Sequence, residues 1–386
     1  MTAARSYLDH NATSPLRPEA RTALLAALEL AGNASSIHAE GRAARQLIED
    51  AREKLAALIG ASPRSIVFTS GGTEANVMAL SPAWMNGDSR ARLFVSSVEH
   101  ASVLRGGRFA AADMELLPVD DAGIVSLEAA RAVFHALHAK GAPFLVSVML
   151  ANNETGAIQP VSALAALVHE YGGLVHCDAA QAVGKVAVDA PALSADLLTV
   201  SAHKFGGPKG VGALAVLRDG LPVSALLTGG GQERGYRAGT EDVAAIAGLG
   251  AAVDAVSGNE GERREIAALR DALEAHIAGV APETVFFSRQ AARLPNTSCF
   301  AVAGMSSETL VIAMDLRGVA VSAGSACSSG KVERSHVLDA MGVPRELGKG
   351  AIRVSLGWNT TDADIERFAA AWSAIYGTFA ARRRAA

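Results

Sequence analysis

The sequence predicts an α/β protein: a larger domain built on a mostly parallel sheet, followed by a smaller α+β domain. Two observations support this fold class. Between Arg17 and about Val256, short apolar runs alternate with amphipathic stretches of helical period, the pattern of parallel strands that helices cover on both faces. Hydrophobic residues make up 50% of the chain and aromatic residues only 5%, so small aliphatic side chains fill most of the core, which suits helices packed on a sheet.

The predicted elements follow in order along the chain. The strands of the larger domain are residues 66–69, 93–96, 144–148, 174–177 and 197–200, and the helices that flank them include residues 39–59, 127–140 and 161–171. A polar turn at Ser257-Gly258-Asn259 leads to a charged helix at 262–276, then to strands at 297–302, 319–322 and 351–355 and helices at 307–316, 335–341 and 362–380. We therefore expect a large domain over 15–256 and a small domain that combines 1–14 with 257–386.

Composition excludes several classes of protein. A net charge of −4 argues against a nucleic-acid binder, which would carry a basic excess. No run is long and apolar enough for a transmembrane helix, which needs about 20 residues, and no secretory signal is visible. The three cysteines, Cys177, Cys299 and Cys327, are too scattered for a disulfide framework or a zinc site. We expect a cytoplasmic protein with no nucleic-acid partner, no membrane partner and no bound metal.

Two neighbouring strand ends carry a lysine and an aspartate with complementary chemistry. Lys204 follows the 197–200 strand in a glycine-rich loop, where burial would keep part of its amine neutral, as a Schiff-base lysine requires. Asp178 ends the preceding strand, where a carboxylate can keep a pyridine nitrogen protonated and make the ring an electron sink. A surface lysine and a helix-capping aspartate would explain each residue alone, but the pair is typical of a pyridoxal phosphate site.

The loop after the 66–69 strand has the features of a phosphate cradle. Ser70-Gly71-Gly72-Thr73 opens a helix, so backbone N–H groups converge there, the hydroxyl of Thr73 adds a donor, and the helix amino terminus favours a dianion. Ser201 and His203, in the lysine loop, could supply further donors. A Gly-Gly turn capped by threonine is also a common structural device.

Four more polar side chains follow strands or lie within one. His100 could place its ring over a cofactor and move protons near neutral pH, and a purely structural histidine is the alternative. Asn152 and Asn153 could fix a carboxylate or a ring hydroxyl, or cap a turn. Arg353 lies among apolar neighbours, where its guanidinium needs an anion: a substrate carboxylate or the acid of a structural salt bridge.

The residues around Cys327 are all small. The segment reads Ser322-Ala323-Gly324-Ser325-Ala326-Cys327-Ser328-Ser329-Gly330, and such a run cannot pack a core, so we expect an exposed loop. A structural cysteine usually has apolar neighbours, which favours a reactive role for this thiol. Cys177 and Cys299 fall inside predicted strands, and we expect both to be unreactive core residues.

Together these motifs resemble one family, the NifS/IscS-type cysteine desulfurases of the class V aminotransferase group. The resemblance extends from Tyr7-Leu8-Asp9-His10-Asn11-Ala12-Thr13 to Arg353-Val354-Ser355-Leu356-Gly357. It includes the Ser-x-His-Lys run at 201–204, the Asn-Asn-Glu run at 152–154 and the glycine-rich run at 229–235. It implies the pyridoxal-phosphate-dependent aminotransferase fold of type I, with a seven-stranded sheet in the large domain.

The resemblance also implies a role for each site residue. Lys204 would hold pyridoxal 5′-phosphate and move protons, Cys327 would attack the substrate sulfur, and His100 would stack on the cofactor ring. Asn153 and Arg353 would bind the carboxylate of L-cysteine. The other cofactor contacts would come from the partner subunit's Thr240 in a homodimer and from Gly72, Thr73, Asn153, Asp178, Gln181, Ser201 and His203.

The implied reaction converts L-cysteine to L-alanine and leaves a persulfide on Cys327, which then donates sulfur to a scaffold protein for iron–sulfur cluster assembly. Cys327 could also serve as a cluster ligand, and a nitrogenase-dedicated enzyme and a housekeeping enzyme share these motifs. The alternatives are a selenocysteine lyase or another class V aminotransferase-type enzyme of the same fold. A transaminase has no use for Cys327, and an inactive scaffold has no use for Lys204 and Asp178 together.

Overall fold

A seven-stranded sheet forms the centre of the larger part of the molecule. The computed structural model describes residues 5–139, 141–222, 225–324 and 334–385. The strand order is β2-β8-β7-β6-β5-β3-β4. Strand β8 is antiparallel to both of its neighbours, and the other neighbouring pairs that the structure describes are parallel. The predicted α/β fold with a mostly parallel seven-stranded sheet is therefore confirmed; its strands are β2 Ile66–Thr69, β3 Arg92–Ser96, β4 Met114–Leu117, β5 Phe144–Met149, β6 Leu174–Asp178, β7 Leu197–Ser201 and β8 Gly212–Val216.

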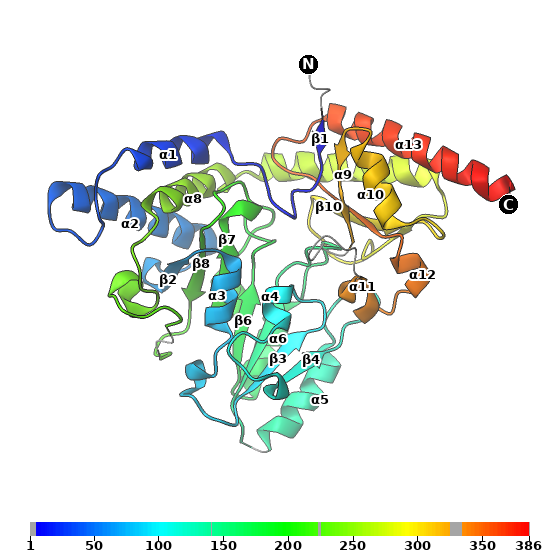
Figure 1. Ribbon diagram of the computed structural model, residues 1–386. Coiled ribbons are helices and arrows are strands. Elements are labelled where there is room, and N and C mark those ends of the chain that lie inside the picture. The colour runs from blue at the N-terminus through cyan, green and yellow to red at the C-terminus, as the bar shows by residue number, and fades with distance from the viewer. Residues whose placement is uncertain (1–4, 140, 223–224, 325–333, 386) are drawn as a thin grey trace.

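The helices of this part begin and end where local chemistry favours it. Helix α2 spans Ala39–Ile59, as predicted; His38 caps its first turn by accepting a hydrogen bond from the Gly41 N–H, and Gly60 ends it in the left-handed region at φ 69°, which glycine adopts without steric cost. Figure 1 shows α2 beside α1 and α8 at one end of the sheet. The other helices of this part are α1 Pro18–Leu28, α3 Gly72–Ala79, α4 Ala101–Leu104, α5 Leu127–His138, α6 Val161–Glu170, α7 Ala190–Leu193 and α8 Val243–Val256.

Two smaller sheets lie beside this layer, with α9, α10 and α13 around them (Figure 1). One has the order β12-β13-β10-β9 and the other pairs β1 with β11. The predicted single strand at 319–322 is wrong, because its two halves pair with different partners: β11 with β1 and β12 with β13. The strands are β1 Ser6–Tyr7, β9 Val285–Phe286, β10 Thr297–Ala301, β11 Val319–Ala320, β12 Ser322–Ala323 and β13 Ile352–Ser355. The helices are α9 Glu260–Val280, α10 Ser307–Asp315, α11 His336–Ala340, α12 Arg345–Gly348 and α13 Asp362–Ala385.

Separate apolar clusters fill the two parts. The largest cluster lies mostly between Ala20 and Val256 and packs on the seven-stranded sheet, and a second one gathers Leu8 with residues from Leu273 to Trp372. Leu294 packs in the first cluster, although the predicted boundary at 256/257 assigns it to the small domain, so the exact division into 15–256 and the remainder stays a prediction. None of the described helices is long and apolar enough to cross a membrane.

Candidate active site

The predicted site residues of the large sheet come together at one edge. Asp178 is the last residue of β6, Lys204 ends the short helix η4 (Ala202–Lys204) directly after β7, and His100 and Asn153 follow β3 and β5. Because these strands are parallel, their carboxyl ends share an edge, which is where α/β sheets bind ligands. Arg353 lies on β13 of the four-stranded sheet, and it meets this edge by donating to the carbonyl of Asn153.

The amine of Lys204 is enclosed by polar groups and by positive charge. Its Nζ donates to the backbone carbonyls of Asn11, at 2.7 Å, and Ala12, at 3.0 Å. Burial and the positive charge of Arg353 lower the pKa of Lys204, against Asp178 and Asp9, which raise it, and together these effects bring it from 10.5 to about 8. A substantial fraction of the amine is therefore neutral near pH 8 and able to act as a nucleophile.

Asp178 is buried with both carboxylate oxygens hydrogen-bonded. Oδ1 accepts the Ala180 N–H at 2.9 Å, and Oδ2 accepts Nδ2 of Asn76, on α3, at 2.8 Å. These two donors fix the orientation of the carboxylate. Asp178 can therefore pair with a protonated ring nitrogen.

His100 caps α4 through its Nδ1 atom. That atom accepts the Ser102 N–H at 3.2 Å and lies 2.8 Å from the Ser102 hydroxyl. The protein around the ring lowers the pKa of His100 below its ordinary value by removing hydration, while Asp178 raises it and Lys204 and His336 lower it. His100 is an exposed residue in this structure, and the lowered pKa favours the neutral form of its imidazole.

The donors of the predicted phosphate cradle converge at the start of α3. Gly72 is the first residue of that helix, and a Cβ added to it would lie 3.2 Å from the Cβ of Ser201, so the two loops touch. Thr73 is exposed and Ser201 is buried. Nδ1 of His203 lies 3.1 Å from the Thr13 hydroxyl, and burial together with Lys204 lowers its pKa to about 4. These hydroxyls and N–H groups at a helix amino terminus suit a phosphate.

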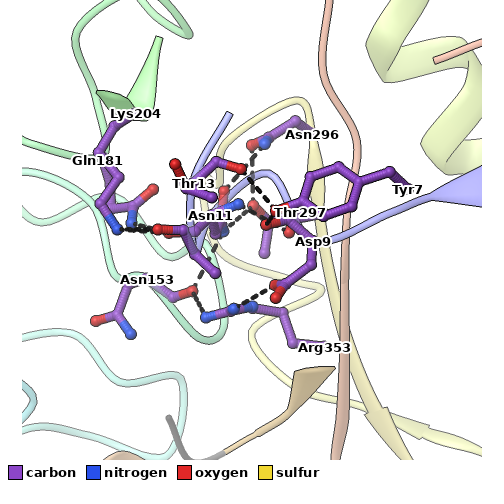
Figure 2. A network of polar contacts seen from close by, with 12 residues as sticks. Tyr7, Asp9, Asn11, Thr13, Asn153, Gln181, Lys204, Asn296, Thr297 and Arg353 are labelled. Atoms are coloured by element: carbon purple, nitrogen blue, oxygen red, sulfur yellow. Dashed lines mark hydrogen bonds and ion pairs between the residues drawn. The ribbon is translucent and has the colours of Figure 1, made fainter. Parts of the chain in front are cut away.

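The two adjacent asparagines have different roles. Oδ1 of Asn152 accepts the N–H groups of Glu154 and Thr155, at 2.8 and 2.9 Å, so Asn152 caps the turn. Asn153 turns its carbonyl towards Arg353, and its side-chain amide makes none of the contacts drawn in Figure 2. Of the two amides, Asn153 is therefore the one free to meet a ligand.

Arg353 has an acidic partner that the sequence did not identify. Its Nη2 donates to Oδ1 of Asp9 at 2.6 Å and its Nη1 to the carbonyl of Asn153 at 3.0 Å (Figure 2). Its Nε is buried and has no partner among the described residues. The guanidinium is thus fixed in place by two of its N–H groups, while the remaining ones, Nε included, are available for an anion.

Asn11 is the centre of the network in Figure 2. Its carbonyl accepts from Lys204 and from Nε2 of Gln181, at 2.9 Å, while its Oδ1 accepts from Lys185 at 2.8 Å. Its Nδ2 donates to the hydroxyl of Thr297, on β10, at 2.9 Å. Asn11, in the amino-terminal segment, therefore connects the lysine loop to the four-stranded sheet through hydrogen bonds. The sequence did not reveal this role.

The three cysteines and Thr240 complete the predicted set. Cys177 and Cys299 are fully buried, as predicted, and burial raises the pKa of both thiols, so we expect both to be unreactive. Thr240 is exposed on this subunit. Cys327 lies outside the described residues, and its role stays a prediction.

Glu154 is a buried acid next to this site. It is 2% exposed, and its Oε2 accepts the hydroxyl of Ser335, the residue that caps α11, at 2.5 Å. Burial raises its pKa from 4.5 to about 7, although Ser335 and Arg353 favour the charged form. At neutral pH the protonated and charged forms are therefore both populated.

This shift predicts a pH dependence of stability. Between about pH 4.5 and 7 the folded state keeps the Glu154 proton that the unfolded state loses, so raising the pH through this window lowers the free energy of unfolding, by up to about 3 kcal/mol. Glu154→Gln removes this dependence. Denaturant unfolding of both proteins at several pH values checks it, with the exposed Glu128→Gln as the control. Parallel curves for the wild type and Glu154→Gln would contradict the assignment.

These features define a class of protein. The family model described as "Aminotransferase class-V" matches residues 6–368, and the chain belongs to this family of pyridoxal-phosphate-dependent enzymes. Among its relatives is "Cysteine desulfurase" of Cereibacter sphaeroides, 46% identical over 369 residues that cover 94% of this chain and 93% of that protein. "Cysteine desulfurase IscS" of Dictyoglomus turgidum is 42% identical over 365 residues, covering 93% and 91%.

Solved structures agree with these relatives. The X-ray structure of a NifS-like protein from Rickettsia africae superposes with a TM-score of 0.85 at 33% identity, covering 97% of this chain and 99% of that one. The predicted resemblance to NifS/IscS-type enzymes is therefore confirmed, and the protein is an enzyme of this class.

Proposed function

We propose that the enzyme is a cysteine desulfurase that carries pyridoxal 5′-phosphate on Lys204, converts L-cysteine to L-alanine and holds the released sulfur as a persulfide on Cys327. The observation that carries the proposal is the pair of strand ends with Lys204 and Asp178 facing Arg353. The site needs three groups to act on an amino acid with this cofactor. They are an amine that can be neutral, a carboxylate for the ring nitrogen and a guanidinium for the substrate carboxylate. Lys204 with its pKa of about 8, the buried Asp178 and the anchored Arg353 supply them.

The residues present fit the cofactor. The phosphate would lie at Gly72 and Thr73, with Ser201 and His203 on its other side, because these groups offer donors at the start of α3. Gln181, buried beside Lys185, would bind the ring hydroxyl. When bound, the cofactor supplies an electron sink for the substrate.

The other side chains would hold the substrate and take its sulfur. Arg353 and Asn153 would bind the carboxylate of L-cysteine, Lys204 and His100 would move its protons, and Cys327 would attack its sulfur as a thiolate. A bond forms between Sγ of Cys327 and the substrate sulfur while the bond from that sulfur to the substrate Cβ breaks. The electron pair of the broken bond stays with the three-carbon remainder, which takes up a proton at Cβ and leaves as alanine. A scaffold protein for iron–sulfur clusters, in the cytoplasm, is the proposed acceptor.

An assay with L-cysteine tests this function. With a reducing thiol present, the purified enzyme should release alanine and sulfide in equal amounts. L-Selenocysteine offered in parallel tests the alternative. Turnover of selenocysteine alone would favour a lyase, and amino-group transfer to a 2-oxo acid without release of sulfide would favour a transaminase.

The site should be complete only in a homodimer. The segment around Thr240 is partly held on its own chain, since Glu233, in η5 (Gln232–Gly235), forms a buried bidentate pair with Arg52 at 2.8 and 2.9 Å. Thr240 itself is exposed, as expected of a residue that reaches a neighbouring subunit. We infer that the partner subunit's Thr240 completes the phosphate site.

Dissociation should therefore release the cofactor. Thr240→Ala should weaken cofactor binding about 10- to 100-fold, as expected for one lost hydrogen bond to a charged group, while the exposed Thr309→Ala should have no effect. Equilibrium dialysis against pyridoxal phosphate and sedimentation of the same samples check both results. A fully active, cofactor-loaded monomer would rule out the composite site.

A further inference from the structure

A continuous chain of hydrogen bonds joins His100 to Asp178. Nδ2 of Asn76 lies 2.8 Å from Oδ2 of Asp178 and 2.8 Å from Oγ of Ser102, and that Oγ lies 2.8 Å from Nδ1 of His100. Asn76 is 1% exposed. The chain starts on α3, the helix that opens with Gly72, and crosses to α4.

The chemistry of the groups fixes the direction of every bond in this chain. The atom of Asn76 that faces Asp178 must be the NH₂ group, because the amide oxygen would repel a carboxylate. This group has two protons, one for each contact. Since the Ser102 oxygen accepts one of them, its own proton is free to go to Nδ1 of His100.

A backbone contact supports the same direction for the hydrogen bond between Ser102 and His100. Nδ1 of His100 also accepts the Ser102 N–H at 3.2 Å. A proton on Nδ1 would point at this N–H, so Nδ1 must be unprotonated. A neutral imidazole without a proton on Nδ1 has it on Nε2, at the opposite edge of the ring.

We propose that Asn76 and Ser102 are positioning residues that fix His100 as the neutral Nε2–H tautomer, so that His100 meets the substrate as a proton donor. The role of His100 as a proton donor rests on the proposed function, and its tautomer does not. Asn76 also holds Asp178, so a single amide sets both the carboxylate for the ring nitrogen and the histidine for the ring face. Burial lowers the pKa of His100, which favours the neutral imidazole. The titratable groups facing His100 are Asp178, Lys204 and His336.

Nitrogen NMR of the histidine-labelled full-length protein tests the tautomer, with and without added pyridoxal phosphate. The His100 signals are assigned by their loss in His100→Gln. In the wild type at pH 7.5 or so, Nε2 should carry the proton. Ser102→Ala removes the hydroxyl contact but keeps the backbone N–H that Nδ1 accepts, so it should lower the fraction of the Nε2–H tautomer without inverting it and raise the pKa of His100, whereas Ser102→Thr should restore the wild-type spectrum.

A second serine provides a matched control. The hydroxyl of Ser97 is buried and has no partner among the described residues, so Ser97→Ala removes the same group without touching the chain. Ser97→Ala should leave the tautomer and the pKa of His100 unchanged. A proton on Nδ1 in the wild type, or an unchanged His100 in Ser102→Ala, would overturn the proposal.

Steady-state kinetics separate the proposal from the proposed function. Ser102→Ala and Asn76→Ala should lower kcat with L-cysteine about 10-fold, the effect of one lost hydrogen bond, with little change in KM, and Ser102→Thr should recover it. An Nε2–H tautomer in a protein that does not act on L-cysteine would refute the proposed function alone. Normal kcat in Ser102→Ala with an altered tautomer would refute the role as proton donor.

Discussion

Lys204→Ala should abolish the visible absorption of the purified enzyme and lower its turnover of L-cysteine by about 10³-fold or more, as losses of covalent catalytic residues do. Lys204 is the amine at the strand end beside Asp178, and its pKa of about 8 leaves part of it neutral. Pyridoxal phosphate added to the variant should bind without covalent attachment. Absorption spectra and borohydride reduction followed by peptide mapping measure both effects.

Lys209→Ala is the matched control, because Lys209 is an exposed lysine five positions further along the same loop. It should keep its colour and its activity. An unchanged spectrum in Lys204→Ala, or borohydride labelling of another lysine, would refute the assignment of the cofactor lysine.

Cys327→Ser should have an equally large effect on turnover but none on the cofactor. The variant should bind pyridoxal phosphate and change its spectrum when L-cysteine is added, because Cys327 acts only after the substrate is bound. It should release almost no alanine, about 10³-fold less or lower still, since a serine hydroxyl stays protonated at neutral pH and attacks sulfur poorly.

The buried cysteines provide the control. Cys177→Ser and Cys299→Ser should keep their chemistry and lose only stability, because each places a hydroxyl in a fully buried strand position, which costs about 1–3 kcal/mol. Wild-type turnover in Cys327→Ser would contradict the persulfide mechanism and favour the lyase alternative.

Most of the large sheet could be predicted from sequence, because the strands β2, β3, β5, β6 and β7 are almost wholly buried and mainly apolar. The two strands that the sequence analysis missed lack this signal. Glu115 and Leu116, in the edge strand β4, are exposed, so the strand is only partly apolar. Strand β8 reads Gly-Ala-Leu-Ala-Val, and glycine and alanine are depleted in strands.

The site residues that carry reactive groups were recognised because each lies at a strand end or in an unusual local sequence. The residues that hold them were not, since they act over long separations in the chain. Asn11 and Lys204 are 193 residues apart, Asp9 and Arg353 are 344 apart, and Asn76 is an ordinary polar residue on a short helix. Only the folded chain brings such pairs together, so no local pattern reveals them.

Mass spectrometry after a short pulse of L-cysteine tests the central claim most directly. The enzyme is quenched with an alkylating agent, digested and compared with an untreated sample and with Cys327→Ser. The proposed function predicts one additional sulfur atom on the peptide that contains Cys327, and none on the peptides of Cys177 and Cys299. A sulfur adduct on Cys177 or Cys299, or alanine release without any adduct on Cys327, would contradict it.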